Sequence, residues 1–115
     1  MDLEATLDTE INDDVEFVLH VVNTGTAAVE LTFPTGQIAD VSVYLENEDD
    51  PVWTWSEDRS FTQAIETRTL EAGAAIEQVF EWVDPPPGAY RAEARLEADR
   101  AVEAETTLRV SSTGQ

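Results

Sequence analysis

Residues 90–97 read Tyr-Arg-Ala-Glu-Ala-Arg-Leu-Glu, an uninterrupted alternation of apolar and charged side chains. In an extended strand, successive side chains point to opposite faces. One face of such a strand would carry the apolar residues Tyr90, Ala92, Ala94 and Leu96, and the other would carry only charged residues. This stretch therefore predicts a β-strand with one face in a core and the other in water.

The same period of two recurs along the chain, and no sustained helical period appears. Further strands are expected at 3–7, 15–23, 27–33, 39–45, 52–55, 76–82 and 102–110. Residues 56–69 are the least regular part. About seven or eight short strands separated by Gly and Pro turns indicate an all-β, antiparallel immunoglobulin-like β-sandwich. We expect a single domain over residues 1–115, with a frayed tail at 111–115.

The step Pro87-Gly88-Ala89-Tyr90 indicates a tyrosine corner, in which the hydroxyl of Tyr90 bonds to an upstream carbonyl. An ordinary core aromatic is the alternative. Ala92 stands where antibody domains place a cysteine, and the chain contains no cysteine at all. The predicted sandwich is therefore free of disulfides and relies on packing.

Composition excludes several classes of partner. All six basic residues are arginine, and 25 acidic residues give a formal net charge of -19. Such a chain repels nucleic acids and anionic membranes, which bind proteins through basic patches. It has no run of about 18 apolar residues and no signal-peptide pattern. We expect a cytoplasmic monomer.

The acidic residues are scattered over nearly every segment, as in a solvated surface. At molar ionic strength the Debye length falls to about 3 Å, so the self-repulsion of such a surface nearly disappears. The pattern predicts a protein from an extreme halophile, whose melting temperature rises with salt.

Enzymatic and metal chemistry find little support. His20 is the sole histidine, it lies within a strand pattern, and no nucleophile elbow accompanies it. Residues 46–50 (Glu-Asn-Glu-Asp-Asp) lack the ligand order of an EF-hand. No glycine-rich phosphate loop is present. We expect a non-enzymatic protein without cofactor or metal.

Residues 52–56 read Val-Trp-Thr-Trp-Ser, and in a strand both indoles would lie on one face. Two interpretations stay open. Trp53 and Trp55 either complete a core with Trp82, Phe33 and Phe61, or form an exposed aromatic patch beside Tyr44 or Phe61. Arg59 would then be either a bait residue for a trypsin-like pocket or a solvated arginine.

The turn at residues 34–37 (Pro-Thr-Gly-Gln) carries the same ambiguity. We expect Gly36 to adopt a positive φ and Asp40 to cap this turn. Gln37 would bond either to the turn itself or to a partner.

Read as one pattern, the chain resembles the intracellular proteinase inhibitor family, the BsuPI domain. The matching pieces are Asn23-Thr24-Gly25, Phe33-Pro34-Thr35-Gly36-Gln37, Asp40, Trp53, Trp55-Ser56, Phe61, Gln63-Ala64, Leu70, Gly73, Trp82, Gly88 and Tyr90. The chain departs from the family pattern at Ala39, Thr54 and Ala72.

This resemblance implies an immunoglobulin-like sandwich of a family whose founding example inhibits an intracellular serine protease. The leading hypothesis is inhibition of such a protease, of the subtilisin-like type, by protein contact. The partner-binding residues would be Trp53, Trp55, Ser56, Arg59, Phe61, Gln37 and Tyr44. A non-inhibitory interaction or regulatory module is the alternative, and a carbohydrate-binding module with sugar rings stacked on paired aromatics is a third hypothesis.

Overall fold

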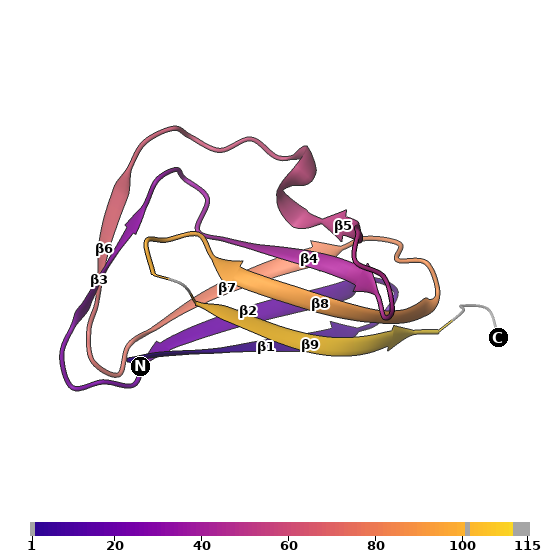
Figure 1. The fold of residues 1–115 in the computed structure, drawn as a ribbon, viewed down its shortest axis with the longest axis horizontal. Helices are drawn as coiled ribbons and strands as arrows, with labels where there is room; N and C mark the ends of the chain where they lie inside the picture. Colours follow the sequence, from indigo (N-terminus) through magenta and orange to yellow (C-terminus); the bar gives the residue numbers. More distant parts are fainter. Residues whose placement is uncertain (1, 101, 112–115) are drawn as a thin grey trace.

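The computed structural model describes residues 2–100 and 102–111, and within them it contains nine strands and one short 3-10 helix (Figure 1). The elements are β1 (Leu3–Ile11), β2 (Val15–Asn23), β3 (Val29–Phe33), β4 (Ala39–Leu45), β5 (Pro51–Thr54), η1 (Trp55–Asp58), β6 (Glu66–Leu70), β7 (Ala75–Trp82), β8 (Gly88–Leu96) and β9 (Glu103–Val110). All strand pairs are antiparallel.

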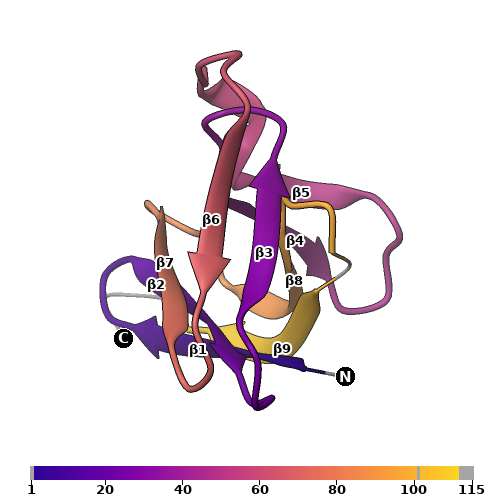
Figure 2. The same cartoon turned by 90° about the vertical axis from the view of Figure 1, so that its left-hand side faces the viewer.

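The strands form two facing layers and a separate ribbon. One layer has the order β1-β2-β7, the other has the order β5-β4-β8-β9, and β3 pairs with β6 in a two-stranded ribbon. The ribbon stands at one end of the sandwich, and its β3–β4 and η1–β6 connections form the top of the molecule in Figure 2. The predicted antiparallel immunoglobulin-like sandwich is confirmed.

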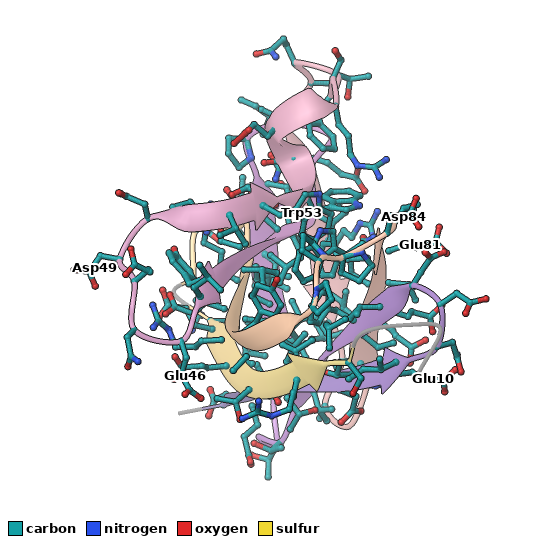
Figure 3. All side chains as sticks on the ribbon, turned by 90° about the vertical axis from the view of Figure 1, so that its right-hand side faces the viewer. Glu10, Glu46, Asp49, Trp53, Glu81 and Asp84 are labelled. Carbon is teal, nitrogen blue, oxygen red and sulfur yellow. The ribbon has the colours of Figure 1, made fainter. Side chains whose placement is uncertain are left out.

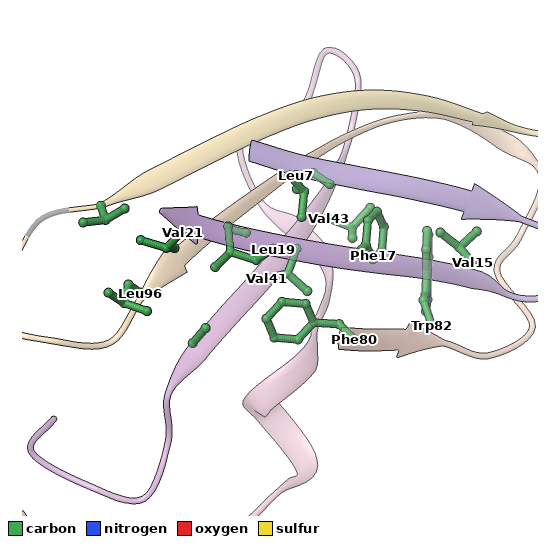
Figure 4. Close-up of a cluster of buried hydrophobic side chains, with 14 of the residues drawn as sticks. Leu7, Val15, Phe17, Leu19, Val21, Val41, Val43, Phe80, Trp82 and Leu96 are labelled. Carbon is green, nitrogen blue, oxygen red and sulfur yellow. The ribbon is translucent and has the colours of Figure 1, made fainter. Parts of the chain in front are cut away.

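The alternating side chains close the core as expected. Val15, Phe17, Leu19 and Val21 of β2 are all buried, and they face buried valines of β4 (Figure 4). Tyr90, Ala92, Ala94 and Leu96 of β8 are also buried. Because each fully buried side chain of this size contributes about 1.5–3 kcal/mol, this core can stabilise the domain without a disulfide.

The predicted tyrosine corner is present. The hydroxyl of Tyr90 donates to the carbonyl oxygen of Pro86 at 2.7 Å. The ring packs edge-on against Trp82, with centroids 5.0 Å apart, and burial raises the pKa of Tyr90 above its ordinary value. The corner thus fixes the entry of β8 to the end of β7.

A buried asparagine fastens the ribbon to the sandwich. Asn23, at the end of β2, is fully buried, and its side-chain amide donates to the carbonyls of Ala27 and Leu70, each at 2.9 Å. Its Oδ1 accepts from the backbone N–H of Gly25 at 2.9 Å. One side chain therefore ties the β2–β3 turn to the end of β6.

The region expected to be irregular contains a strand. β6 pairs with β3 from Phe33↔Glu66 to Val29↔Leu70. Only Leu70 of its five residues is buried, so this strand carries no alternating apolar signal. Several boundaries also differ: β1 continues to Ile11, beyond the expected 3–7, β3 begins at Val29, and Trp55 opens η1 after β5 has ended. Of the tail predicted to fray, Ser111 follows β9 and is exposed, and 112–115 lie outside the described residues.

In the described part of the chain, no helix has the length and apolar character needed to cross a bilayer.

Candidate functional site

Trp53 closes one side of the core. It pairs with Val43 across β4 and β5, so its ring points between the layers. The ring stacks on Trp82 with centroids 5.6 Å apart and lies 6.5 Å from Phe17. Trp53 is half-buried and packs against the core. The face of its ring that contacts Trp82 therefore agrees with the interpretation in which Trp53 completes the core.

Trp55 packs one step further along the same side. Its ring meets Phe80 edge-on at 5.0 Å and Phe61 at 5.8 Å, and both Trp55 and Phe61 are half-buried. The guanidinium of Arg59 lies 4.5 Å from the centre of the Trp55 ring, and its Nε donates to the Trp55 carbonyl at 3.0 Å. The exposed Arg59, which directly follows η1, is thus held against Trp55 and does not extend freely into solvent.

A buried carboxyl group holds the start of η1. Asp40 is 2% exposed, although it lies on the outer face of β4. Its Oδ1 accepts from the N–H groups of Val41 (2.9 Å) and Ser56 (3.1 Å). Its Oδ2 accepts from the hydroxyl of Ser56 at 2.6 Å and from Arg95 at 3.4 Å. The expectation that Asp40 caps the 34–37 turn is therefore wrong, since its partners lie in η1 and β8.

The 34–37 turn and the loop of residues 59–65 lie side by side, and we call them together the ridge. The N–H of Gly36 donates to the carbonyl of Thr62 at 2.9 Å. A Cβ on Gly36 would lie only 2.5 Å from Thr62 Oγ1. The predicted positive φ at Gly36 is wrong, because the structure assigns positive φ to Gly73 and Gly88 instead. Gly36 is needed for this close approach of the loop.

Gln37 serves the turn itself. Its N–H donates to Thr35 Oγ1 at 3.1 Å, and its side-chain amide donates to the carbonyl of Ala39 at 3.3 Å. The side chain is half-buried. These contacts fix the shape of the ridge next to the loop.

The ridge differs in charge from the rest of the surface. Residues 59–65 (Arg-Ser-Phe-Thr-Gln-Ala-Ile) and residues 31–39 contain no acidic residue, in a chain that has 25. By contrast, Glu10, Glu46, Asp49, Glu81 and Asp84 surround the end of the sandwich that carries Trp53, while η1 rises above them (Figure 3). The ridge is therefore an exposed, carboxylate-free projection on an acidic molecule.

Tyr44 does not belong to this region. It lies on the outer face of β4, with the Arg91 guanidinium 4.6 Å from the centre of its ring. Arg91 in turn pairs with Glu93 at 2.8 Å and with Glu105 at 3.2 Å, and the hydrogen bond to Glu93 raises the pKa of Arg91. The sequence grouped Tyr44 with the tryptophans, whereas the structure places its ring in a surface ion network.

His20 lies between two carboxylates. On the outer face of β2, its Nε2 lies 3.2 Å from Asp8 and its Nδ1 lies 3.1 Å from Glu77. No group of three metal-binding side chains occurs within residues 2–100 and 102–111.

A depression of about 420 Å³ over β8 and β9 is lined by Glu93, Ala94, Arg95, Glu103, Ala104 and Glu105, without an aromatic ring.

The fold and the ridge define a class of protein, an immunoglobulin-like sandwich with a projecting loop held by a buried carboxyl group and an aromatic cluster. Residues 3–101 match the family BsuPI, described as an intracellular proteinase inhibitor. The chain belongs to this family. A comparison with curated protein sequences finds no match.

Solved structures share the fold. The CARDB domain of PF1109 from Pyrococcus furiosus has a TM-score of 0.53 and 20% identity, over 96% of this chain and 94% of that chain. Red sea bream transglutaminase (TM-score 0.58, 12% identity) matches 97% of this chain, which spans 17% of the transglutaminase. β-Glucosidase from Kluyveromyces marxianus has a TM-score of 0.53 and 16% identity, over 96% of this chain and 14% of that enzyme. At these identities the likeness concerns the fold alone.

Proposed function

We propose that this protein inhibits an intracellular, subtilisin-like serine protease by placing the 59–65 loop in the substrate cleft. Membership of the proteinase inhibitor family is the observation that carries this proposal. The ridge supplies a surface of suitable form, because its loop is exposed and projects from the sandwich. No catalytic role is proposed for the chain.

The loop is anchored at three places, which favours inhibition over cleavage. Asp40 holds Ser56 before the loop, Gly36 holds Thr62 in its middle, and the ladder between β3 and β6 begins directly after it. A loop held near its bound shape loses little conformational entropy on association. The three anchors would also hold the loop in the substrate cleft of the protease while one of its peptide bonds is strained.

Charge supports the same surface. Charged residues are depleted at the centre of protein interfaces, because a carboxylate that loses water without a partner destabilises the complex. The ridge is free of acidic residues over both of its segments. The acid-rich end around Trp53 would need a basic partner, whereas the ridge imposes no such demand.

We also propose that the protein works in a salty cytoplasm, for which the net charge of -19 is the support. Salt would then screen the repulsion between this acidic surface and any acidic partner. The inhibition assay should accordingly be run in concentrated KCl.

The decisive test is titration of a subtilisin-like intracellular protease with the purified protein in about 2 M KCl, a concentration at which the Debye length is below about 3 Å. We expect stoichiometric loss of activity. Gln63→Glu, which adds one charge to the exposed loop, should weaken inhibition about 10- to 100-fold, as expected for an unpaired charge at an interface centre. Asn12→Asp adds the same charge in the exposed β1–β2 turn and serves as the matched control.

Three results would overturn the proposal. Protease activity that stays unchanged at excess protein would exclude inhibition, and binding without loss of activity would identify a non-inhibitory interaction module. Equal weakening by the two charge variants would exclude the 59–65 loop as the contact.

A further inference from the structure

We propose that Ile65 is the residue that selects the target, by filling an apolar specificity pocket of the protease. This inference rests on the proposed inhibitory function and adds the chemical class of the pocket. The target would then be a protease that prefers substrates with large apolar side chains, and not one that recognises arginine or lysine.

Ile65 is 74% exposed, more than any other large apolar side chain in the described part of the chain. Val83 at 58% and Val52 at 47% follow, and both lie outside the ridge. Water solvates such a side chain poorly, so its transfer into an apolar pocket improves binding by about 10- to 100-fold. An exposed isoleucine within a carboxylate-free loop is therefore a preformed anchor for a partner.

The backbone beneath this side chain is fixed. Glu66, the next residue, pairs with the fully buried Phe33 in the ladder between β3 and β6. Thr62, three residues earlier, accepts the hydrogen bond from Gly36 at 2.9 Å. Only the short side chain of Ile65 would lose freedom on binding, which is the property of an interface anchor.

The other large side chains of the loop are already engaged within the protein. Phe61 is half-buried against Trp55, and Arg59 lies over the same ring and bonds to its carbonyl. The bait interpretation of Arg59 would require both of these contacts to break. Ile65 needs no such rearrangement to enter a pocket.

The immediate surroundings of Ile65 also suit a cleft. Ala64 is small, and Gln63 is uncharged and exposed. The carboxylate of Glu66, the next residue in the chain, is paired with Arg68 Nε at 2.7 Å. The chain neighbours of Ile65 therefore present neither a large side chain before it nor an unpaired carboxylate after it.

The test compares two variants that remove the same kind of side chain from different places. Ile65→Ala should raise the inhibition constant about 10- to 100-fold against a subtilisin-like protease with an apolar pocket, with an unchanged melting temperature. Val83→Ala, which also trims an exposed apolar residue, should leave the inhibition constant unchanged. Circular dichroism would confirm that both variants are folded.

A third variant examines specificity directly. Ile65→Arg should weaken inhibition of the protease with the apolar pocket and create inhibition of a trypsin-like protease, whose pocket carries an acidic residue. If the unaltered protein inhibits but Ile65→Ala inhibits equally well, the role of Ile65 is refuted and the inhibitory function stands. If the unaltered protein inhibits neither class of protease, the inhibitory function itself is refuted.

Discussion

Removal of the Ser56 hydroxyl tests whether Asp40 organises the ridge. In Ser56→Ala, the 2.6 Å hydrogen bond to Asp40 Oδ2 is lost, while the N–H bond of the same residue to Oδ1 remains. A hydrogen bond to a charged acceptor contributes about 1.5–3 kcal/mol, and Asp40 is 2% exposed, so water cannot readily replace the hydroxyl. We expect the free energy of unfolding to fall by about 1.5–3 kcal/mol and the melting temperature to fall by roughly 6–12 °C.

Asp40→Ala should destabilise the protein more. It leaves the backbone N–H groups of Val41 and Ser56 and the Ser56 hydroxyl without their acceptor, and it removes one of the two carboxylate partners of Arg95, which keeps Glu97 at 2.6 Å. Because the Arg95 side chain is 46% exposed, the cost comes chiefly from the three donors that lose their acceptor, at about 1–3 kcal/mol for each donor that water does not reach. The order of stabilities expected from the structure is therefore the unaltered protein, then Ser56→Ala, then Asp40→Ala.

Ser42→Ala is the matched control for Ser56→Ala. Ser42 is buried on the same face of β4 as Asp40. Its hydroxyl contacts the neutral hydroxyl of Thr54 at 3.2 Å. Loss of this neutral hydrogen bond should cost about 0.5–1.5 kcal/mol. Both losses are measured by denaturant unfolding in concentrated KCl.

Amide hydrogen exchange then separates a local role from a global one. In Ser56→Ala, the amides of η1 and of the 59–65 loop should exchange faster than the fall in global stability explains, whereas those of β8 should follow global unfolding. The reasoning is refuted if Ser56→Ala costs no more than Ser42→Ala, or if exchange in the loop is unchanged.

Four further perturbations follow from the same contacts. Gly36→Ala should weaken inhibition because its Cβ would meet Thr62 Oγ1, and Thr62→Ala in the same protein should restore part of the loss in a titration of the protease. Tyr90→Phe should lower the free energy of unfolding by about 0.5–1.5 kcal/mol at pH 8. Because the pKa of Tyr90 is raised in the folded protein, the contribution of Tyr90 to stability is complete below pH 10.0 and falls above it. The difference in unfolding free energy between the unaltered protein and Tyr90→Phe should therefore shrink as the pH rises above 10.0. Trp53→Ala should cost about 3 kcal/mol by chemical denaturation, the low end for a tryptophan because the ring is half-buried, and Trp53→Phe much less. Raising KCl from about 0.1 M to about 1 M shortens the Debye length from about 10 Å to about 3 Å and should raise the melting temperature, whereas sucrose of equal osmolarity should not match it; equal melting temperatures at both KCl concentrations would contradict the halophilic interpretation.

Most of the sandwich follows from the sequence because its strands have one face in the core. The register of β2 and β8 is carried by their own alternation, and the buried residues are those at the expected positions. β6 could not be found in this way, since four of its five residues face solvent and its place depends on pairing with β3. Local pattern detects strands that pack, and it misses strands that only pair.

The candidate site follows from the sequence less completely than the sandwich does, because its contacts join residues that are distant in the chain. The sequence marked Trp55, Ser56, Phe61 and Gln37, which the structure does bring to the ridge or its base. It also marked Tyr44, whose ring lies on the outer face of β4 against Arg91. Residue type alone does not say on which face of a strand an aromatic side chain lies, so the sequence could not separate Tyr44 from the tryptophans. The role of Asp40 was missed because its partner Ser56 lies sixteen positions away, across the β4–β5 hairpin.

Most residues that carry the family resemblance support the proposed contact loop from within, although Gln63 and Ala64 lie in that loop and belong to the matching pieces as well. Gly36, Asp40, Ser56 and Phe61 belong to the matching pattern, and each supports the 59–65 loop from within the protein by a close approach, a hydrogen bond or ring packing. Ile65 lies outside the matching pieces and touches solvent over most of its surface. A shared support with a separate contact residue allows one scaffold to present different side chains to different proteases. Substitutions at Asp40 should therefore weaken inhibition of every target together, whereas substitutions at Ile65 should change which protease is inhibited.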